Sequence, residues 1–270
     1  MTLVIRLSSL GDVVLASSIT AALAPVVFFT KPRYAELVRR FPGVEVVVSR
    51  REDLPAVDRV VDLQSSPWTW LRWPTAERVR MHRWARWRRV ALKSGGPIPL
   101  VVERYAEAAR VATSPRPWIP VERSFARIGL VPGAAHATKR WPHWEALAER
   151  LDEVVVFGHP DDGLELPGDA CIEEGFDRTL EGLAGCRVVV GGDTGLVHLA
   201  AALGVPVVGL FGPTSSGDGF WCHPGRALEL EMPCRPCSRH GGPHCAIGDH
   251  ACMTGIGVGQ VAEAIAELCR

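Results

Sequence analysis

The chain has 270 residues, of which 47% are hydrophobic and 22% are charged, and this is the composition of an ordinary globular protein. It excludes intrinsic disorder as the main state, because disordered chains combine low hydrophobicity with high net charge. The 30 basic and 30 acidic side chains cancel, which argues against a protein dedicated to nucleic acid. The length suits one large domain or two domains of Rossmann size.

Two uncharged stretches, residues 13–30 and 194–217, are candidate membrane spans. Pro25 interrupts the first, and Asp12 stands directly before it, which disfavours a signal peptide. Glycines and prolines between residues 204 and 213 divide the second into pieces shorter than the roughly 20 residues of a spanning helix. The sequence therefore predicts a soluble, cytoplasmic protein.

Short apolar runs alternate with helical periodicity along the first half, which predicts a parallel sheet with helices on both faces. The predicted strands cover residues 2–7, 26–29, 44–48 and 59–63, and the predicted helices cover 13–24, 31–41 and 101–112. Residues 114–120 hold three prolines and read as a linker.

The second half repeats this alternation. Its predicted strands cover residues 126–131, 154–157, 188–190 and 205–211, and its predicted helices cover 144–151, 180–184, 196–203 and 260–269. We therefore predict an α/β protein with two Rossmann-like, doubly wound domains, residues 1–120 and 121–270. Ligands of such folds bind outside the carboxyl ends of the strands, so the site is expected in the cleft between the domains.

Three polar segments follow predicted strands. Residues 6–12 place Asp12 between a strand and its helix, where it suits either a general base or a helix cap. Residues 190–198 end a strand in two glycines before a helix start, which suits a phosphate; the alternative is a capped helix with His198 in the core. In residues 132–142, Lys139 suits a cation that neutralises a leaving phosphate; the alternative is a solvated basic loop.

Together these segments resemble glycosyltransferase family nine, the heptosyltransferases of lipopolysaccharide core assembly. The matching stretches are residues 5–13, 102–105, 139–142, 192–204 and 206–214. The resemblance implies a GT-B fold, in which two Rossmann-like domains face a central cleft. It also implies inverting transfer of a sugar, typically a heptose from an ADP-linked donor, to a lipopolysaccharide-type or other glycan acceptor, with no cofactor required for catalysis.

The resemblance implies roles for individual residues as well. It makes Asp12 the base that deprotonates the acceptor hydroxyl, and Lys139 the cation that stabilises the diphosphate leaving group. The residues expected to bind the donor are Thr138, Arg140, Asp193, Thr194, Gly195, Leu196 and His198. The residues expected to bind the acceptor are Ser9, Gly11 and Arg104.

The sequence departs from the family pattern in its short first half and in residues 157–162, which lack the glutamate that often follows that strand. The first half also carries a segment rich in tryptophan and arginine, residues 68–93, in which Glu77 is the only acid. Such a segment suits peripheral contact with the inner face of the membrane or a phosphorylated acceptor. The alternative is a tryptophan core beneath a solvated basic face.

Four of the eight cysteines gather in a loop rich in glycine and proline, and the first two have the spacing of metal ligands. They are Cys234, Cys237, Cys245 and Cys252. A structural zinc site, or an iron–sulfur cluster, is predicted there, and free thiols or a labile disulfide are the alternatives.

Two other functions fit the same residues. One is a nucleotide-sugar epimerase or hydrolase of GT-B fold. The other is a non-catalytic, metal-containing protein that binds phosphorylated polymers through residues 68–93.

Overall fold

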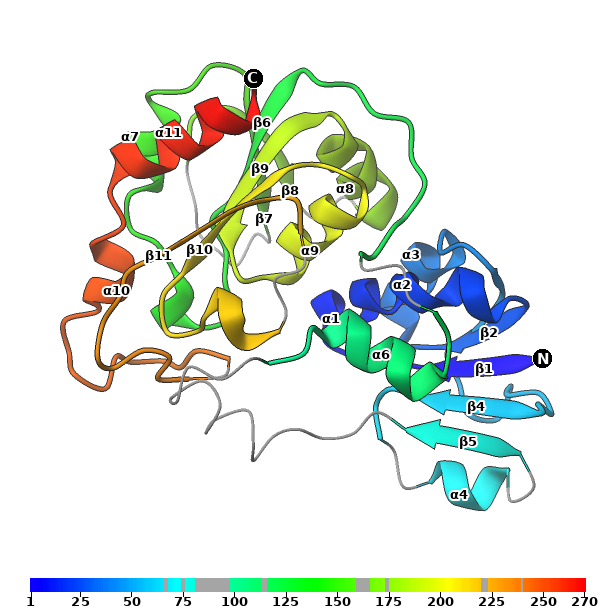
Figure 1. Ribbon diagram of the computed structural model, residues 1–270. Coiled ribbons are helices and arrows are strands. Elements are labelled where there is room, and N and C mark those ends of the chain that lie inside the picture. The colour runs from blue at the N-terminus through cyan, green and yellow to red at the C-terminus, as the bar shows by residue number, and fades with distance from the viewer. Residues whose placement is uncertain are drawn as a thin grey trace.

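The computed structural model describes residues 1–65, 68–73, 76–80, 98–112, 116–158, 166–172, 175–219, 223–238 and 240–270. Two parallel sheets, one in each half of the chain, organise these residues (Figure 1). The predicted α/β architecture of two doubly wound halves is therefore confirmed.

The first sheet has five parallel strands in the order β3-β2-β1-β4-β5. The strands are β1 Thr2–Ile5, β2 Val26–Phe29, β3 Val44–Val48, β4 Arg59–Asp62 and β5 Glu77–Arg80. The helices of this half are α1 Leu10–Leu15, α2 Ser17–Thr20, α3 Ala35–Arg39, α4 Thr69–Arg72 and α6 Val101–Ala109. Short 3₁₀ turns, η1 Ala21–Leu23 and η2 Pro32–Tyr34, precede β2 and α3.

The second sheet has six parallel strands in the order β11-β10-β9-β6-β7-β8. The strands are β6 Arg127–Val131, β7 Val154–Gly158, β8 Asp169–Ile172, β9 Cys186–Gly192, β10 Val207–Phe211 and β11 Gly225–Glu229. The α-helices are α7 Trp144–Ala148, α8 Gly175–Ala184, α9 Gly195–Ala202, α10 Ala251–Thr254 and α11 Val258–Leu268. Two 3₁₀ turns are η3 Ala137–Lys139 and η5 Ser216–Asp218.

Each sheet has a point at which the strand order reverses. In the first sheet, β1 lies between β2 and β4, and the chain changes direction at the β1–β4 pair. In the second, β6 lies between β7 and β9, and the change comes at the β6–β9 pair. Loops diverge at such a point and leave room for a ligand at the carboxyl ends of the strands. The segments after β1, β6 and β9 are therefore the ones placed to form sites.

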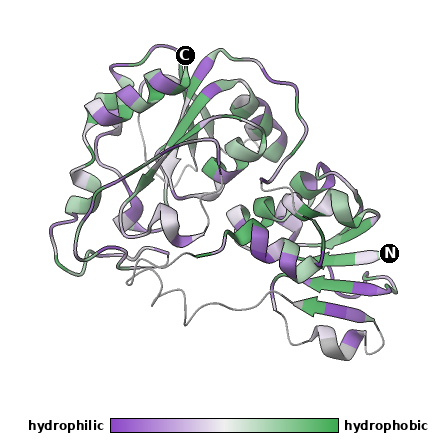
Figure 2. Ribbon diagram, in the orientation of Figure 1, coloured by the Kyte–Doolittle hydropathy of each residue, from purple (hydrophilic) through white to green (hydrophobic). Residues whose placement is uncertain are grey.

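The inner strands are nearly continuous apolar runs, as expected for parallel sheets covered on both faces. All four side chains of β2 are buried, and the inner strands are largely green in Figure 2. In the second half, α7, α10 and α11 lie on one face of the sheet, and α8 and α9 lie on the other (Figure 1). One apolar cluster joins Val4 and Phe28 of the first half to Phe157 and Val189 of the second.

The two halves meet where α1 lies against α9 (Figure 1). Glycines permit this close approach. A Cβ built on Gly11 would lie 2.7 Å from Cδ2 of His198, and one built on Gly195 would lie 2.7 Å from Cβ of Leu10. The backbone also crosses the boundary, because the amide of Ile119 donates to the carbonyl of Ala202 at 2.8 Å.

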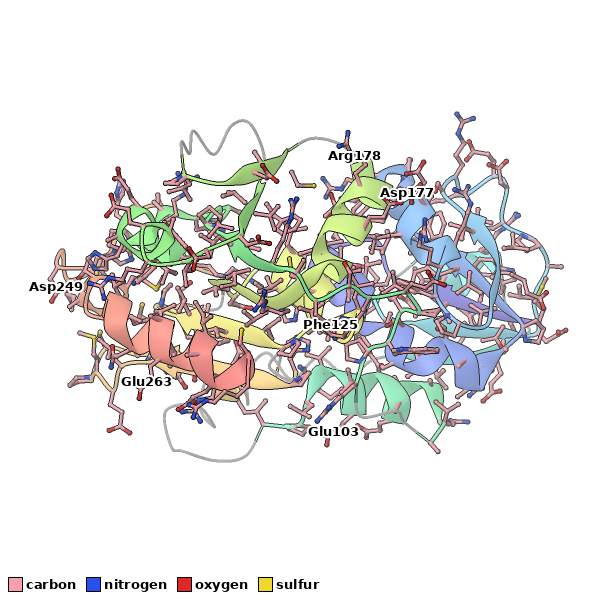
Figure 3. The ribbon with its side chains drawn as sticks, turned by 90° about the horizontal axis from the view of Figure 1, so that it is seen from above. Glu103, Phe125, Asp177, Arg178, Asp249 and Glu263 are labelled. Atoms are coloured by element: carbon pink, nitrogen blue, oxygen red, sulfur yellow. The ribbon has the colours of Figure 1, made fainter. Side chains whose placement is uncertain are left out.

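Further contacts between the halves lie away from these helices. The amide of Val101 donates to the carbonyl of Gly219 at 2.7 Å. On the surface, Nη2 of Arg40 pairs with Asp177 at 2.7 Å; Figure 3 shows Asp177 and Arg178 on α8, beside the first half. The two halves are therefore in contact at several places besides the α1–α9 pair.

Several predicted elements differ from the observed ones. The helix expected over residues 13–24 begins at Leu10 and breaks into α1, α2 and η1. The strands β5, β8 and β11, which lie at the sheet edges, were not predicted because each is only four or five residues long and carries at least one charged side chain. None of the helices that the structure describes is long and apolar enough to cross a membrane.

The segment of residues 68–93 lies only partly among the described residues. Trp73 is buried, and Trp68 is packed beside it against Phe29, with the ring centroids of Trp68 and Phe29 5.8 Å apart. The guanidinium of Arg51 lies 4.6 Å from the Trp68 ring centroid. The core alternative therefore holds for these two tryptophans. Residues 81–93, on which the membrane prediction mostly rests, lie outside the described part of the chain, as do residues 159–162.

Candidate functional site

Asp12 lies in the first turn of α1, directly after the carboxyl end of β1. Its Oδ1 accepts an ion-paired hydrogen bond from Nη2 of Arg6 at 2.6 Å. Its Oδ2 accepts from the Ser9 amide at 3.0 Å and from the Ser9 hydroxyl at 2.9 Å. The bond from the Ser9 amide is that of a helix-capping residue at the third position. The capping role expected for Asp12 is thus observed, and its side chain is still 17% exposed.

The environment of Asp12 favours its ionised form. Burial raises the pKa of the carboxyl, but the charge and hydrogen bond of Arg6 and the two bonds from Ser9 outweigh it. The pKa of Asp12 therefore lies below its ordinary value. The group is ionised at neutral pH and can accept a proton.

Lys139 and Asp193 meet at the reversal point of the second sheet. Lys139 ends η3, after β6, and Asp193 follows β9 directly. Nζ of Lys139 donates to Oδ2 of Asp193 at 2.9 Å and also to the Asp193 carbonyl. Both side chains are mostly buried, at 13% and 17% exposure. The sequence singled out these two residues as candidate site residues in separate segments, and the structure brings them into contact.

Asp193 precedes the N-terminus of α9, where free backbone amides and the helix dipole favour an anion. Burial raises the pKa of Asp193, but the hydrogen bond from His198 and the charge of Lys139 overcome it, so this pKa is strongly lowered. Thr194 caps α9 with extended backbone angles. Its hydroxyl is buried and has no hydrogen-bond partner among the described residues. This end of α9 therefore combines a cation, helix amides and a free hydroxyl.

His198 connects this cluster to His223, a residue that the sequence did not single out. Nε2 of His198 lies 3.5 Å from Oδ1 of Asp193, and its Nδ1 lies 2.6 Å from Nε2 of His223. If His198 carries its proton on Nε2, facing Asp193, then its Nδ1 accepts the Nε2–H of His223. Burial and the neighbouring His198 hold the pKa of His223 well below its ordinary value. No sequence motif marks His223, which lies 25 residues further along the chain than His198.

Thr138 ties the Lys139 turn to the Cys-rich loop, residues 234–252. Its hydroxyl donates to the Gly242 carbonyl at 2.9 Å and accepts from the Gly242 amide at 2.8 Å. The carbonyl of Thr138 lies 2.7 Å from Nε2 of His250. A cavity of about 380 Å³ opens between the turn and the loop. It is lined by Ala137, Thr138, Pro243, His244, Cys245, Gly248 and His250. The sequence did not predict that this loop borders the turn that carries Lys139.

The structure describes all four cysteines of that loop, for which the sequence predicts a metal site. Within the described ranges, no group of three or more His, Cys, Asp or Glu side chains is placed to hold a metal ion. Cys252 is buried in the core, whereas Cys237 is exposed. The thiol of Cys245 accepts backbone hydrogen bonds from Ile247 and His250 within its own turn, and these lower its pKa. None of the four forms a disulfide with another described residue, and the metal site stays a prediction.

The other predicted site residues occupy varied positions. Ser9 is exposed, and Gly11 is buried against His198. Arg104 is buried on α6. Gly195 and Leu196 begin α9, and Leu196 packs against the apolar cluster. Arg140 is exposed, and its Nε donates to the Ala134 carbonyl at 3.2 Å.

The Asp12 and Lys139 clusters border the same contact between α1 and α9. Leu10, two residues before Asp12, touches Gly195, two residues after Asp193. Asp12 on the first half thus lies on one side of this contact. Lys139 and the N-terminus of α9, on the second half, lie on the other side. The arrangement can take a proton on one side and stabilise a departing anion on the other.

The sequence of this chain matches a known protein family. Residues 95–240 match the model of glycosyltransferase family 9 (heptosyltransferase). Lipopolysaccharide heptosyltransferase 1 of Pseudomonas aeruginosa is 37% identical over 127 residues, which is 39% of this chain and 34% of that protein. Lipopolysaccharide heptosyltransferase 2 of Escherichia coli is 38% identical over 109 residues, 33% of this chain and 31% of that protein. The aligned part thus spans about a third of each curated relative.

Among solved structures, the Escherichia coli ADP-heptose lipopolysaccharide heptosyltransferase II shares the fold at a TM-score of 0.73 and 24% identity. That comparison covers 99% of this chain and 98% of the other. The two-domain arrangement of the GT-B fold is therefore present here. Because the family model matches residues 95–240, which is more than half of this chain, the chain belongs to glycosyltransferase family 9, the heptosyltransferase family.

Proposed function

We propose that the protein is a glycosyltransferase that moves a heptose from an ADP-linked donor to a lipopolysaccharide-type glycan acceptor. One observation carries the proposal: the Lys139–Asp193 cluster at the start of α9 and the Asp12 carboxylate flank the same junction between the halves. Residues 1–120 are assigned to the acceptor and residues 121–270 to the donor. The relatives named above support the heptose and the ADP-linked donor.

In the proposed reaction, the acceptor hydroxyl attacks the anomeric carbon while Asp12 takes its proton. The bond from that carbon to the diphosphate oxygen breaks, and the negative charge passes to the diphosphate. Lys139 and the amides at the start of α9 stabilise this charge. A single displacement at the anomeric carbon inverts its configuration.

The donor side is tested first by isothermal titration of the protein with ADP, UDP and GDP. We expect ADP to bind most tightly and Lys139→Ala to weaken it at least tenfold, because a charge-assisted contact to phosphate is lost. Lys31→Ala, at an exposed lysine in the first half, is the matched control and keeps the affinity. If no nucleotide binds, or if both variants weaken binding equally, the assigned donor site is wrong.

The transfer itself is tested with ADP-heptose and a heptose-free lipopolysaccharide core. We expect a mass increase of one heptose on the acceptor and an inverted anomeric signal by NMR. Asp12→Asn keeps the shape but cannot take the proton, so the rate should fall by roughly 10²- to 10⁴-fold while ADP affinity persists. Consumption of the donor without acceptor would identify a hydrolase or epimerase. An unchanged Asp12→Asn variant would remove Asp12 from the mechanism.

A further inference from the structure

The two oxygens of the Asp12 carboxylate have partners of different kinds. Oδ1 faces Nη2 of Arg6 at 2.6 Å and the hydroxyl of Tyr105 at 3.4 Å. Among the described residues, Oδ2 faces the amide and the hydroxyl of Ser9 alone. A carboxylate offers about four lone-pair positions, so each oxygen has two neighbours.

The partners of Oδ1 are fixed by the fold. Arg6 follows the last residue of β1, and its Nη1 donates to the Leu63 carbonyl, which follows the last residue of β4, at 2.6 Å. The guanidinium is therefore held by both strands at the point where the sheet order reverses. Tyr105 is fully buried on α6 and lies beside Arg6, whose guanidinium carbon is 5.9 Å from its ring centroid. Burial is the main reason that the pKa of Tyr105 is raised, so the hydroxyl stays a donor.

The partners of Oδ2 differ, because one of them can leave. The Ser9 amide is backbone, whereas the Ser9 hydroxyl is exposed and turns about a single bond. A hydroxyl from outside the protein can take the place of the Ser9 hydroxyl on Oδ2. No comparable exchange is open on Oδ1, because Arg6 and Tyr105 are both buried.

We propose that Arg6 is the positioning residue for Asp12: it holds Oδ1 and so presents Oδ2 to the acceptor hydroxyl, with Tyr105 in a supporting role. The proposal rests on the proposed function, in which Asp12 is the base. Proton transfer then forms the O–H bond on Oδ2 and breaks the O–H bond of the acceptor as its oxygen attacks. Arg6 keeps its proton throughout, since its guanidinium does not titrate in this range.

The charged and titratable groups around Asp12 come from four elements. They are Arg6 after β1, Asp62 of β4, Arg104 and Tyr105 of α6, and His198 of α9, whose ring lies against Gly11. Among them, Arg6 makes the direct ion pair with the carboxylate. Removing its charge leaves a buried carboxylate without its main stabilising partner, and the acidic limb of the rate profile moves to higher pH.

The test measures kcat, the KM for ADP-heptose and the pH profile of kcat/KM in Arg6→Met, Arg6→Lys and Tyr105→Phe. We expect Arg6→Met to lower kcat about 100-fold, to leave the donor KM within about twofold, and to move the acidic limb up by about one pH unit or more. Arg6→Lys restores the charge and should recover part of kcat and return the limb toward its original position. Tyr105→Phe removes a long hydrogen bond and should lower kcat only a few-fold.

Two matched controls lie elsewhere in the same half. Arg59 on β4 also bonds a carboxylate, Glu77, and a carbonyl, Ala109, but at the opposite ends of the strands. Arg59→Met and Tyr34→Phe should leave the pH limb unchanged. If Arg6→Met keeps the limb in place, or if Arg59→Met moves it equally, Arg6 has no positioning role.

A measurement without substrate separates this proposal from the proposed function. The pH dependence of urea unfolding in wild type, Arg6→Lys, Asp12→Asn and the double variant reports the Arg6–Asp12 coupling alone. We expect the pH-dependent part of the Arg6→Lys effect to vanish in the Asp12→Asn background, where the constant cost of the altered bond to Leu63 remains. Coupling without transfer activity would overturn the proposed function and, with it, the role of Arg6. Transfer activity without coupling would overturn the role of Arg6 only.

Discussion

His223 shows how a residue without any motif becomes part of a site. It is buried, and its ring reaches Asp193 through His198, so its protonation state is coupled to the donor cluster. Lys139, in turn, is already paired with Asp193. In the proposed reaction, the donor diphosphate would therefore meet a cation whose position is set by a carboxylate and two imidazoles.

The lowered pKa of His223 has a consequence for stability. The folded protein holds this ring neutral, whereas in the unfolded chain the His223 ring has an ordinary pKa of about 6.5. Below that pH, the unfolded chain therefore binds a proton that the folded protein does not. Stability from the neutral ring is full above that pH and is lost as the pH falls, with a slope of up to about 1.4 kcal/mol per pH unit. We expect the free energy of unfolding to fall between about pH 7 and 5, and to fall less in His223→Gln.

Urea unfolding at several pH values measures this difference. His244→Gln, at an exposed histidine of the Cys-rich loop, is the control and should keep the wild-type slope. Equal slopes in wild type and His223→Gln would show that His223 is protonated in the folded protein.

The sequence predicted part of this site and missed the rest for identifiable reasons. Asp12, Lys139 and Asp193 were found because each follows a strand in a short polar segment. Arg6 lies in the same segment as Asp12, yet its contact with Leu63 depends on which strand lies beside β1. Tyr105 and His223 depend on pairings across 93 and 25 residues, which no local pattern encodes.

At the scale of elements, α1 and α9 decide where the two halves touch. Both contact glycines sit in helices, where glycine costs stability compared with alanine. Their presence is explained by the neighbouring atoms, because each missing Cβ makes room for a side chain of the other helix. The lower helix stability that glycine brings is thus offset by the close contact that it permits beside the site.

Gly11→Ala tests this packing. The new Cβ would lie 2.7 Å from the His198 ring, which is held between Asp193 and His223 and cannot turn away freely. We expect a loss of about 1–3 kcal/mol in the free energy of unfolding and weaker ADP binding. Gly259→Ala in α11, where no atom lies within 4 Å of the new Cβ, should instead stabilise the protein by about 0.5–1 kcal/mol. A neutral Gly11→Ala would mean that the junction adapts.

The accuracy of the predicted elements follows their apolar sequence rather than their burial, since only one of the five residues of β3 is buried. The predicted ranges for β2 and β3 agree with the structure at both ends, since each is a short apolar run bounded by turn residues. The start of α1 was predicted three residues late, because its first turn carries the polar Asp12, which caps it. The strand β11 has a partner on one side only, so alternation with polar side chains hides it.

For the whole molecule, the apolar cluster that crosses between the halves implies joint unfolding. Neither half keeps its full core when the other is lost, because Val4 and Phe28 share one cluster with Phe157 and Val189. We expect a single calorimetric transition, with the calorimetric and van't Hoff enthalpies equal. ADP at about 100 times its Kd should raise the whole transition, by about 2.7 kcal/mol in free energy.

Two resolved transitions, with only the second moved by ADP, would show that the halves unfold independently. The ion pair of Arg40 with Asp177 is exposed, so its removal by Asp177→Asn should leave a single transition. That variant is the control for contacts that touch both halves but add little energy.

The junction of α1 and α9 also limits how such a protein could be rebuilt from parts of its relatives. A chimera that takes its first half from another family member would place that protein's own residues opposite His198 and Gly195. If the first half binds the acceptor, as proposed, its preference can be transplanted only where the new residues fit this face of α9, so the interchangeable unit is the half plus that helix rather than the half alone.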